Sequence, residues 1–431
     1  MKTVAKALLV LVPVAMLAYI IAFVTVNVPY LEDTRCILGQ LIAPFPGRVY
    51  HLFDLNNEHR LVTTRLAAEF ANLAFGRIDF RIMCALGSVA LLSWVLLLCR
   101  QFARRAGIVF CSSFMFIAFS FVHFENQCWA LAGLSNYQTL LWGMCANLCM
   151  MHYRSPRCLL GAICCAILAS WSNGGGLAIW PCLVVQITAL HLMRKDDRPA
   201  FFVCFLVLVL AAAACIATYF IGLDRAAGMP HVSFFARVRM CVLFGLAFLG
   251  GWIPSYKLAV MAGLVMVGAI LLVACRLRSV RSHAVMFHLL YLLGIIGGAS
   301  LGRCDNPHVA LSSRYAVFSI GTMICTVFLL LELYGGRFRR AALCAFFGCA
   351  VLYAAVPFAV GVPLYTARNE VMRHNILLWP GSTEGIRCWE EEREEYDAIL
   401  RETSRRGIYN PLDNLKPGEA VPKELAPCFY Q

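Results

Sequence analysis

The strongest constraint on this chain is a series of apolar runs that are each long enough to cross a bilayer. A transmembrane helix needs roughly twenty predominantly apolar residues, and inside a membrane only helices and closed barrels satisfy their own backbone groups. The mean hydropathy of +0.72 and the 61% share of hydrophobic residues fit the same class. The sequence therefore predicts an all-α polytopic membrane protein.

The runs predict about eleven transmembrane helices on the usual length criterion. They fall near 7–26, 81–99, 106–123, 137–153, 158–172, 176–193, 200–222, 258–275, 284–301, 315–334 and 341–362. The first run is longer than the apolar part of a typical signal peptide, and no small-residue cleavage site follows it, so we expect a retained helix. A shorter run at 239–251 predicts an interfacial or re-entrant helix.

The basic residues predict the orientation, because short cytoplasmic loops carry an excess of lysine and arginine. A cytoplasmic N-terminus assigns the whole net charge of +13 to the inner side. The inner basic residues are then Lys2, Lys6, Arg100, Arg104, Arg105, Arg154, Arg157, Arg194, Lys195, Arg198, Arg276, Arg278, Arg281, Arg337, Arg339 and Arg340. Membrane topology accounts for this positive charge, so no nucleic-acid partner is needed to explain it. An odd number of spans leaves the C-terminus extracytoplasmic.

This topology divides the chain into a transmembrane domain, 1–362, and an extracytoplasmic tail, 363–431. The domain includes an outer loop, 27–80. In the tail, the charged run 384–406 predicts a helix that Ser382 or Thr383 begins and Gly407 ends, as a small amphipathic cap on the membrane surface. Most of the 21 cysteines lie in the spans as small apolar residues, while Cys388 and Cys428 could form a disulfide in an oxidising compartment.

The outer loop holds two groups of ionisable residues, Glu32-Asp33 and the segment 54–60, which begins with Asp54. Carboxylates at a membrane surface are costly unless they are solvated or paired, so they are functional candidates. One carboxylate of a pair can raise the pKa of the other, which suits a general base. The alternative is a solvated helix end with Arg35 as its partner. The sequence leaves open whether Asp33 or Asp54 lies deeper.

The residues Asn57-Glu58-His59-Arg60 precede a stretch with helical apolar periodicity that runs to about Gly76. This stretch predicts a helix lying on the membrane surface. The four polar residues would then sit at its start, where free amides and the helix dipole favour an anion. His59 could titrate near neutrality, although a lone histidine is more often structural.

Two arginines, Arg303 and Arg314, flank a short outer loop and could grip a phosphate bidentately. Arg314 and Tyr315 could equally anchor a helix at the interface. Asn173 precedes three glycines, which permit either a close backbone approach or a tight hairpin. Together with a polar segment at 125–138, these groups all fall on the predicted outer face. Such a face suits a substrate with an apolar anchor, a phosphate and a polar head.

This arrangement resembles the GT-C superfamily of multispan glycosyltransferases, which use polyprenyl-phosphate-linked sugars on the outer leaflet. Leu31-Glu32-Asp33 is the best match to the acidic motif of that superfamily's first outer loop. The segments 57–60, 172–177, 180–181 and 313–315 look like recurring features of bacterial proteins of this type. The likeness covers most of residues 1–362 through short motifs, and the chain is compact for the superfamily.

The resemblance implies an inverting transfer of a sugar from a polyprenyl-phosphate donor to a cell-surface glycan, lipid or protein acceptor. The location it implies is the bacterial inner (plasma) membrane. Asp33 or Glu32 would be the catalytic base, and Arg303 and Arg314, with Arg60, would neutralise the leaving phosphate. The other substrate-binding candidates are Asp54, Glu58, His59, Tyr315 and Asn173. A divalent cation is compatible with this chemistry, but no ligand spacing demands one.

Two other functions compete with this one. A lipid-linked glycan transporter or flippase would need polar residues through its mid-membrane interior, whereas the polar residues here gather on one face. A non-catalytic protein of an envelope assembly would make the tail its working part. These alternatives make different predictions for Asp33→Asn and for removal of the tail.

Overall fold

The computed structural model describes residues 2–44, 46–194, 198–223, 233–336, 339–417 and 419. In these ranges the chain is helical apart from one hairpin of two short antiparallel strands, so it is an all-α polytopic membrane protein. The bundle contains α1 (Lys2–Tyr19), α5 (Phe80–Ala103), α6 (Gly107–Ala118), α7 (Phe124–Cys128), α8 (Ala130–Met150), α9 (Pro156–Ser170), α10 (Ile179–Arg194), α11 (Arg198–Phe220), α12 (Phe234–Leu249), α13 (Tyr256–Cys275), α14 (His283–Arg303), α15 (Ser313–Tyr334) and α16 (Arg339–Leu378).

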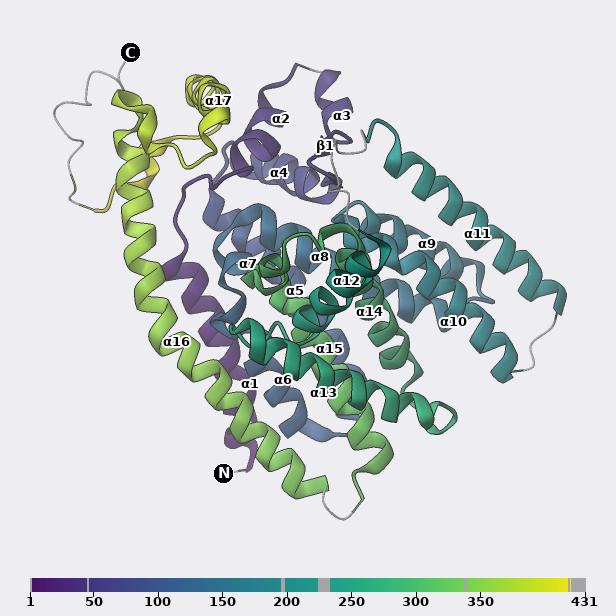
Figure 1. The fold of residues 1–431 in the computed structure, drawn as a ribbon. Coiled ribbons are helices and arrows are strands. Elements are labelled where there is room, and N and C mark those ends of the chain that lie inside the picture. Colours follow the sequence, from purple (N-terminus) through teal and green to yellow (C-terminus); the bar gives the residue numbers. More distant parts are fainter. Residues whose placement is uncertain are drawn as a thin grey trace.

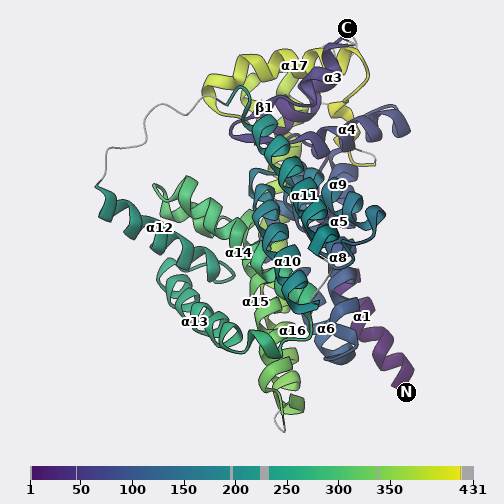
Figure 2. The same ribbon diagram turned by 90° about the vertical axis from the view of Figure 1, so that its right-hand side faces the viewer.

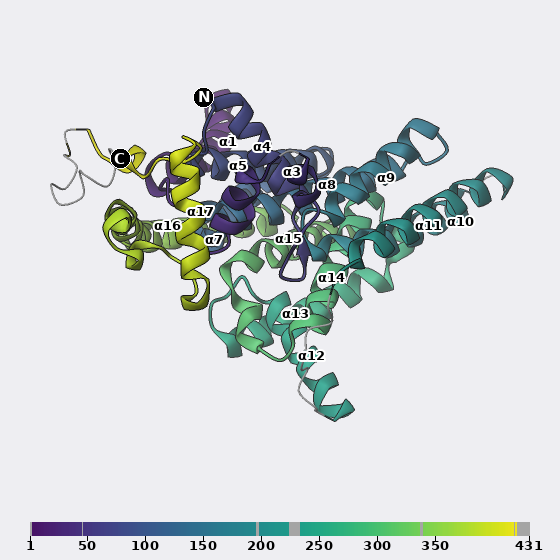
Figure 3. The same cartoon turned by 90° about the horizontal axis from the view of Figure 1, so that it is seen from above.

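The remaining elements form a cap at the end of the bundle opposite the start of α1 (Figures 1 and 2). They are α2 (Gln40–Ile42), α3 (Gly47–His51), β1 (Leu55–Asn56), β2 (His59–Arg60), α4 (Val62–Phe75) and α17 (Arg393–Arg405). The cap therefore joins the first outer loop to residues from the far end of the sequence. Seen from above, α10 and α11 extend to one side of the central helices (Figure 3).

Nine helices in the described ranges are long and apolar enough to cross a membrane. The two other predicted spans correspond to α8, which is long but carries several polar residues, and to α9, which has only 15 residues. The predicted run 239–251 belongs to α12, which begins earlier, at Phe234, and has 16 residues. The count of eleven transmembrane helices stays a prediction.

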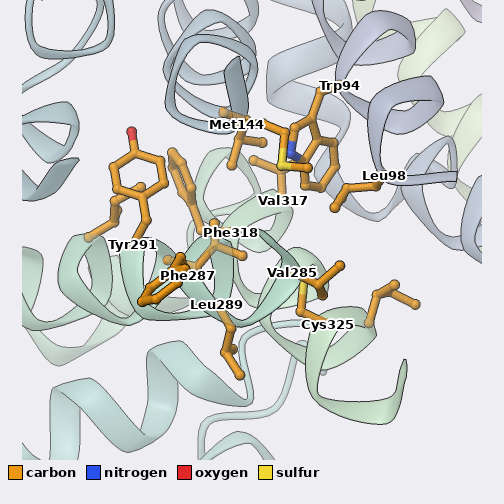
Figure 4. Packing of buried hydrophobic residues seen from close by; sticks show 14 of the residues in the cluster. Trp94, Leu98, Met144, Val285, Phe287, Leu289, Tyr291, Val317, Phe318 and Cys325 are labelled. Atoms are coloured by element: carbon orange, nitrogen blue, oxygen red, sulfur yellow. The ribbon is translucent and has the colours of Figure 1, made fainter. Parts of the chain in front are cut away.

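The bundle core is built from large side chains that meet between α5, α8, α14 and α15 (Figure 4). Trp94 and Tyr291 are fully buried there, and the Trp94 indole donates to His288 at 2.9 Å. Gly143 permits the contact between α8 and α14, because a Cβ atom at that position would lie 2.1 Å from the Tyr291 ring. These helices meet at the end of the bundle that carries the polar site.

The cap has its own apolar core, in which the tail packs against the first loop. Tyr396 and Leu400 of α17 are buried with Ile37 and Leu38. Arg35 pairs with Glu395 at 2.5 Å and with Glu392 at 2.9 Å across the same contact. The tail is therefore tied to the loop by both apolar burial and ion pairs.

The helix predicted for the charged tail is present but shorter, since the residues before Arg393 form short 3₁₀ turns. Ser382 caps the first of these turns, and Gly407 ends α17 in the left-handed conformation, with φ +69°. The prediction for Gly407 is confirmed. Cys388 is a free thiol, and its proposed partner Cys428 lies outside the described residues.

The last transmembrane helix is longer than the sequence predicted, because α16 continues from the bundle into the cap as 40 residues. The predicted boundary between the transmembrane domain and the tail, residue 362, therefore lies inside this helix. Asn369 donates from Nδ2 to the Val24 carbonyl at 2.6 Å, and Ile376 and Leu377 are buried at the cap. Tertiary contacts thus keep the helix intact where the apolar sequence pattern ends.

Candidate functional site

A polar pocket of about 90 Å³ lies where the cap meets the bundle. Its lining combines charged, amide and aromatic side chains from segments far apart in the sequence. The lining residues are Glu32, Asn56, Asn57, His59, Leu61, Trp129, Leu131, Ala132, Ser135, Asn136, Asn173, Arg303, Arg314 and Tyr315. Six of the ten site residues predicted from the sequence line it: Glu32, His59, Asn173, Arg303, Arg314 and Tyr315.

Arg314 is held by its backbone, while its guanidinium faces the pocket. The Glu125 carboxylate accepts from the Arg314 amide at 3.0 Å and from the hydroxyls of Ser312 and Ser313 at 2.9 and 2.7 Å. The Arg314 carbonyl accepts from Asn126 at 2.8 Å. Glu125 thereby caps the first turn of α15, where free amides attract an anion.

The Arg314 guanidinium stacks on two rings, with Cζ 5.6 Å from the centroid of Trp129 and 5.4 Å from that of Tyr315. Its Nε is buried without a hydrogen-bond partner, and no ion pair to it occurs within the described ranges. A buried polar atom without a hydrogen-bond partner is costly. This group is therefore the site's clearest acceptor for an anionic ligand.

A chain of amides links Arg314 to the glycine segment. Asn126 accepts from Asn136 at 2.8 Å, and Asn136 accepts from Asn173 at 2.9 Å. Asn173 in turn accepts from the Gly175 amide at 3.0 Å and begins the 3₁₀ helix η4 (Gly174–Ala178). Because each of these contacts orients its neighbour, the pocket wall is largely preorganised.

Two of the three glycines of this segment, Gly174 and Gly176, allow close approach, the first of the two alternatives that the sequence left open. A Cβ atom at Gly174 would lie 2.8 Å from Nδ1 of His59, and one at Gly176 would lie 1.9 Å from the Ala169 carbonyl oxygen. The Gly174 amide nitrogen lies 3.3 Å from Nδ1 of His59. Gly174 thus lets the hairpin β1–β2 lie against the bundle, and Gly176 lets η4 lie against the end of α9.

Arg303, at the C-terminal end of α14, contacts three partners. It donates to Tyr315 Oη, to the Glu58 carboxylate and, at 3.0 Å, to Nε2 of His59. Because a guanidinium can only donate, Nε2 is the acceptor nitrogen of the His59 ring. Burial, together with the charges of Arg303 and Arg314, lowers the pKa of His59 to about 4 despite the opposing effect of Glu58. The imidazole is neutral at physiological pH and acts as a hydrogen-bond acceptor.

The two residues of the acidic motif point to different surroundings. Glu32 lines the polar pocket and has a buried oxygen, Oε2, without a partner. Asp33 is 1% exposed and is absent from the pocket lining. Its carboxylate accepts from the amides of Tyr30 and Leu131 at 3.1 and 3.0 Å. Of the two candidate bases, Glu32 is the one that a substrate in the pocket could reach.

Burial raises the pKa of Asp33 to about 8, although its two backbone hydrogen bonds favour the ionised form. By accepting from Leu131, Asp33 ties the first loop to the start of α8, next to Trp129 and the pocket wall. Asp33 is therefore placed to support the pocket.

Two other candidates lie away from the pocket lining. Asp54 is exposed and pairs with His51 at 2.5 Å. Arg60 donates to the backbone carbonyls of Phe53, Tyr219 and Ile221, which fixes the hairpin to the end of α11. The guanidinium group of Arg60 is thus already hydrogen-bonded to backbone carbonyl groups.

The prediction that residues 57–60 begin a helix was wrong, although the helix itself is confirmed as α4. Asn57 and Glu58 form the tip of the hairpin β1–β2, with Asn57 at φ +53°. Asparagine tolerates this conformation better than most residues. A pattern of apolar residues locates a helix but cannot show that the residues before it turn back on themselves.

An apolar groove of about 820 Å³ shares four residues with the polar pocket: His59, Asn173, Arg303 and Tyr315. Most of its other lining side chains are apolar and come from η4, α11 and α14, such as Leu177, Phe220 and Ile295. Phe220 and Leu301 at its edge are 49% and 69% exposed. The groove can therefore take an apolar chain whose polar end reaches Arg303.

Sequence reasoning noted the segment 125–138 but did not include Glu125, Asn126, Asn136 or Trp129 among the site residues. The signal was their amide and carboxylate chemistry on the predicted outer side. Within the described part of the chain, no group of three or more histidine, cysteine or acidic residues is arranged to hold a metal ion. Comparisons with protein-family models, curated proteins and solved structures find no match to this chain.

Proposed function

We propose that this protein is a membrane glycosyltransferase that moves a sugar from a polyprenyl-phosphate donor to a glycan, lipid or protein acceptor on the outer leaflet. The observation that supports this most is that two cavities meet. The polar pocket is lined by Arg314, whose Nε has no hydrogen-bond partner, and by Glu32, and the apolar groove shares Arg303 with that pocket. A lipid phosphate sugar has the matching parts in the same order.

In this mechanism the prenyl chain lies in the groove, and the phosphate lies where the groove meets the polar pocket, between Arg303, which lines both cavities, and Arg314 of the pocket. Glu32 takes the proton from an acceptor hydroxyl, whose oxygen attacks the anomeric carbon. The bond between that carbon and the phosphate oxygen breaks, and the electron pair leaves with the phosphate. A positioned base contributes roughly 10²–10⁴ in rate. A donor to the developing oxyanion contributes about 3–4 kcal/mol.

The proposed orientation sets the cap on the outer side and the start of α1 in the cytoplasm. It rests on the basic loops of the sequence, and it brings the pocket to the leaflet that displays surface glycans. In the proposed bacterial inner membrane, the substrate would enter the groove from the lipid phase beside α11.

The test is to identify lipids that co-purify with the full-length protein by mass spectrometry. A polyprenyl phosphate or its sugar conjugate should accompany the wild type and be lost in Arg314→Ala. The matched control is Arg77→Ala, because Arg77 is an exposed arginine of the same cap that pairs with Asp413. A complete lipid-linked oligosaccharide would favour the transporter, and bulk phospholipid alone in every variant would contradict both functions.

A further inference from the structure

The two arginines of the site differ in what occupies them. The Arg314 guanidinium stacks on rings and has no acidic partner among the described residues. The Arg303 guanidinium is fully engaged, with Glu58, His59 and Tyr315. Only one of these three partners, Glu58, carries a charge at neutral pH. The site thus contains one open cation and one that is already neutralised by the protein.

Glu58 stands at the junction of the two cavities. It lies at the hairpin tip, where Asn57 lines the polar pocket, Glu58 lines the apolar groove and His59 lines both. Its carboxylate therefore contacts Arg303 from the groove side. A chain with an anionic head that enters through the groove would meet this ion pair before it reached the polar pocket.

The ion pair is built so that one partner can leave while the other stays. The Glu58 side chain is 51% exposed, whereas that of Arg303 is 26% exposed. Arg303 keeps His59 and Tyr315 as partners when Glu58 turns away, and the released carboxylate can be rehydrated. A phosphate presents the oxygens that an arginine fork binds in place of a carboxylate.

We propose that Glu58 is a resident anion that occupies Arg303 until the phosphate group of a ligand displaces it, and that this exchange selects anionic over neutral chains. For the lipid ligand, the inference rests on the proposed function. A neutral alcohol of the same length cannot replace the charge of Glu58, so the ion pair between Glu58 and Arg303 stays intact when the alcohol binds. A partly exposed ion pair changes an equilibrium by a factor of about two to five, which sets the size of the effect.

The experiment compares wild type with Glu58→Gln, using binding of farnesyl monophosphate, farnesol and inorganic phosphate to the full-length protein in detergent. Glu58→Gln should bind both phosphate probes about two- to fivefold more tightly and farnesol equally well. Asp54→Asn is the matched control, because it removes a carboxylate of the same loop that pairs with His51. In an Arg303→Ala background, Glu58→Gln should have no further effect.

A second variant, Glu58→Ala, removes the carboxylate together with its side-chain contacts and should shift phosphate binding in the same direction. Unchanged or weaker binding of inorganic phosphate in both variants would overturn the inference. Tighter inorganic phosphate with no binding of farnesyl monophosphate to any form would uphold the exchange and contradict the lipid donor. These outcomes separate the resident anion from the proposed function.

Discussion

Leu31 explains why two adjacent carboxylates have different surroundings. Its φ of +48° is rare for a bulky side chain and directs the chain so that Glu32 lines the pocket while Asp33 is buried. Backbone strain of this kind costs of order 1–3 kcal/mol and often occurs at functional sites. A sequence pattern can identify an acidic pair, but it carries no information on such a local turn.

At this scale we predict that Glu32→Gln abolishes transfer without loss of thermal stability. The variant keeps the size of the side chain and removes the proton acceptor, which is worth roughly 10²–10⁴ in rate. The measurement is sugar transfer alongside thermal unfolding in detergent. Glu69→Gln, a carboxylate of the cap that pairs with Arg48 outside the pocket, is the control. Wild-type transfer by Glu32→Gln would remove this residue from the mechanism.

Asp33 should make the stability of the protein depend on pH. Its pKa of about 8 in the folded protein lies above its ordinary value of 3.8, so the folded state binds the proton more tightly than the unfolded state. Stability should therefore fall as the pH rises from about 4 to 8 and then level off. Thermal unfolding across this range should show less of that slope in Asp33→Asn. An unchanged slope would assign the pH dependence to other groups.

Arg314→Ala should raise the KM for the lipid donor at least several-fold more than the KM for the acceptor. The reason is that the unpartnered guanidinium is the anion-binding group of the pocket, and charge-assisted contacts are the stronger kind. Steady-state kinetics with each substrate varied in turn measures the split. Equal changes in both KM values would contradict a specific role toward the phosphate.

At the scale of elements, the site depends on the hairpin β1–β2 resting on the glycine segment. The sequence identified His59, Asn173 and both arginines as residues of one face, because the polarity of outer loops is readable from charge. It did not identify the hairpin, because a strand of two residues has no periodicity to detect. Glu125 was likewise noted without a role, since its capping of α15 joins residues 188 and 189 positions apart.

The close approach of η4 to the end of α9 predicts that Gly176→Ala destabilises the protein by about 1–3 kcal/mol, as overpacking does. The added Cβ would lie 1.9 Å from the Ala169 carbonyl oxygen. Gly297→Ala on α14 is the control, because a Cβ there meets nothing within 4 Å, and alanine is the better helix former. Denaturation in detergent compares the two. Equal stability would mean that η4 moves freely to accept the methyl group.

At the scale of the whole molecule, composition predicted the class and most of the helices, since apolar runs of bilayer length have few other solutions. The tail could not be foreseen in the same way. Its burial against the first loop depends on Ile399 and Leu400 meeting Ile37 and Leu38, which lie more than 350 residues away. Apolar positions in a charged helix show that the helix packs against another segment, but they do not identify that segment.

The orientation gives a prediction for the complete chain. A phosphatase that is active only outside the cytoplasm should be active when fused after residue 415 and inactive when fused at the N-terminus. A fluorescent reporter that folds only in the cytoplasm should show the reverse pattern. Matching signals from both ends would contradict an odd number of spans, and a cytoplasmic signal after residue 415 would place the cap on the inner side.

The 40-residue helix α16 has a mechanical consequence. At 1.5 Å per residue it is about 60 Å long, roughly twice the thickness of the hydrocarbon layer. Part of its length must therefore lie outside the hydrocarbon layer, and Pro357 and Pro363 near its middle permit a bend between the two parts. Bilayer thickness would then set the distance between the pocket and the membrane surface. In a thinner membrane the pocket would lie farther from short, lipid-bound acceptors, and in a thicker membrane it would lie closer to them.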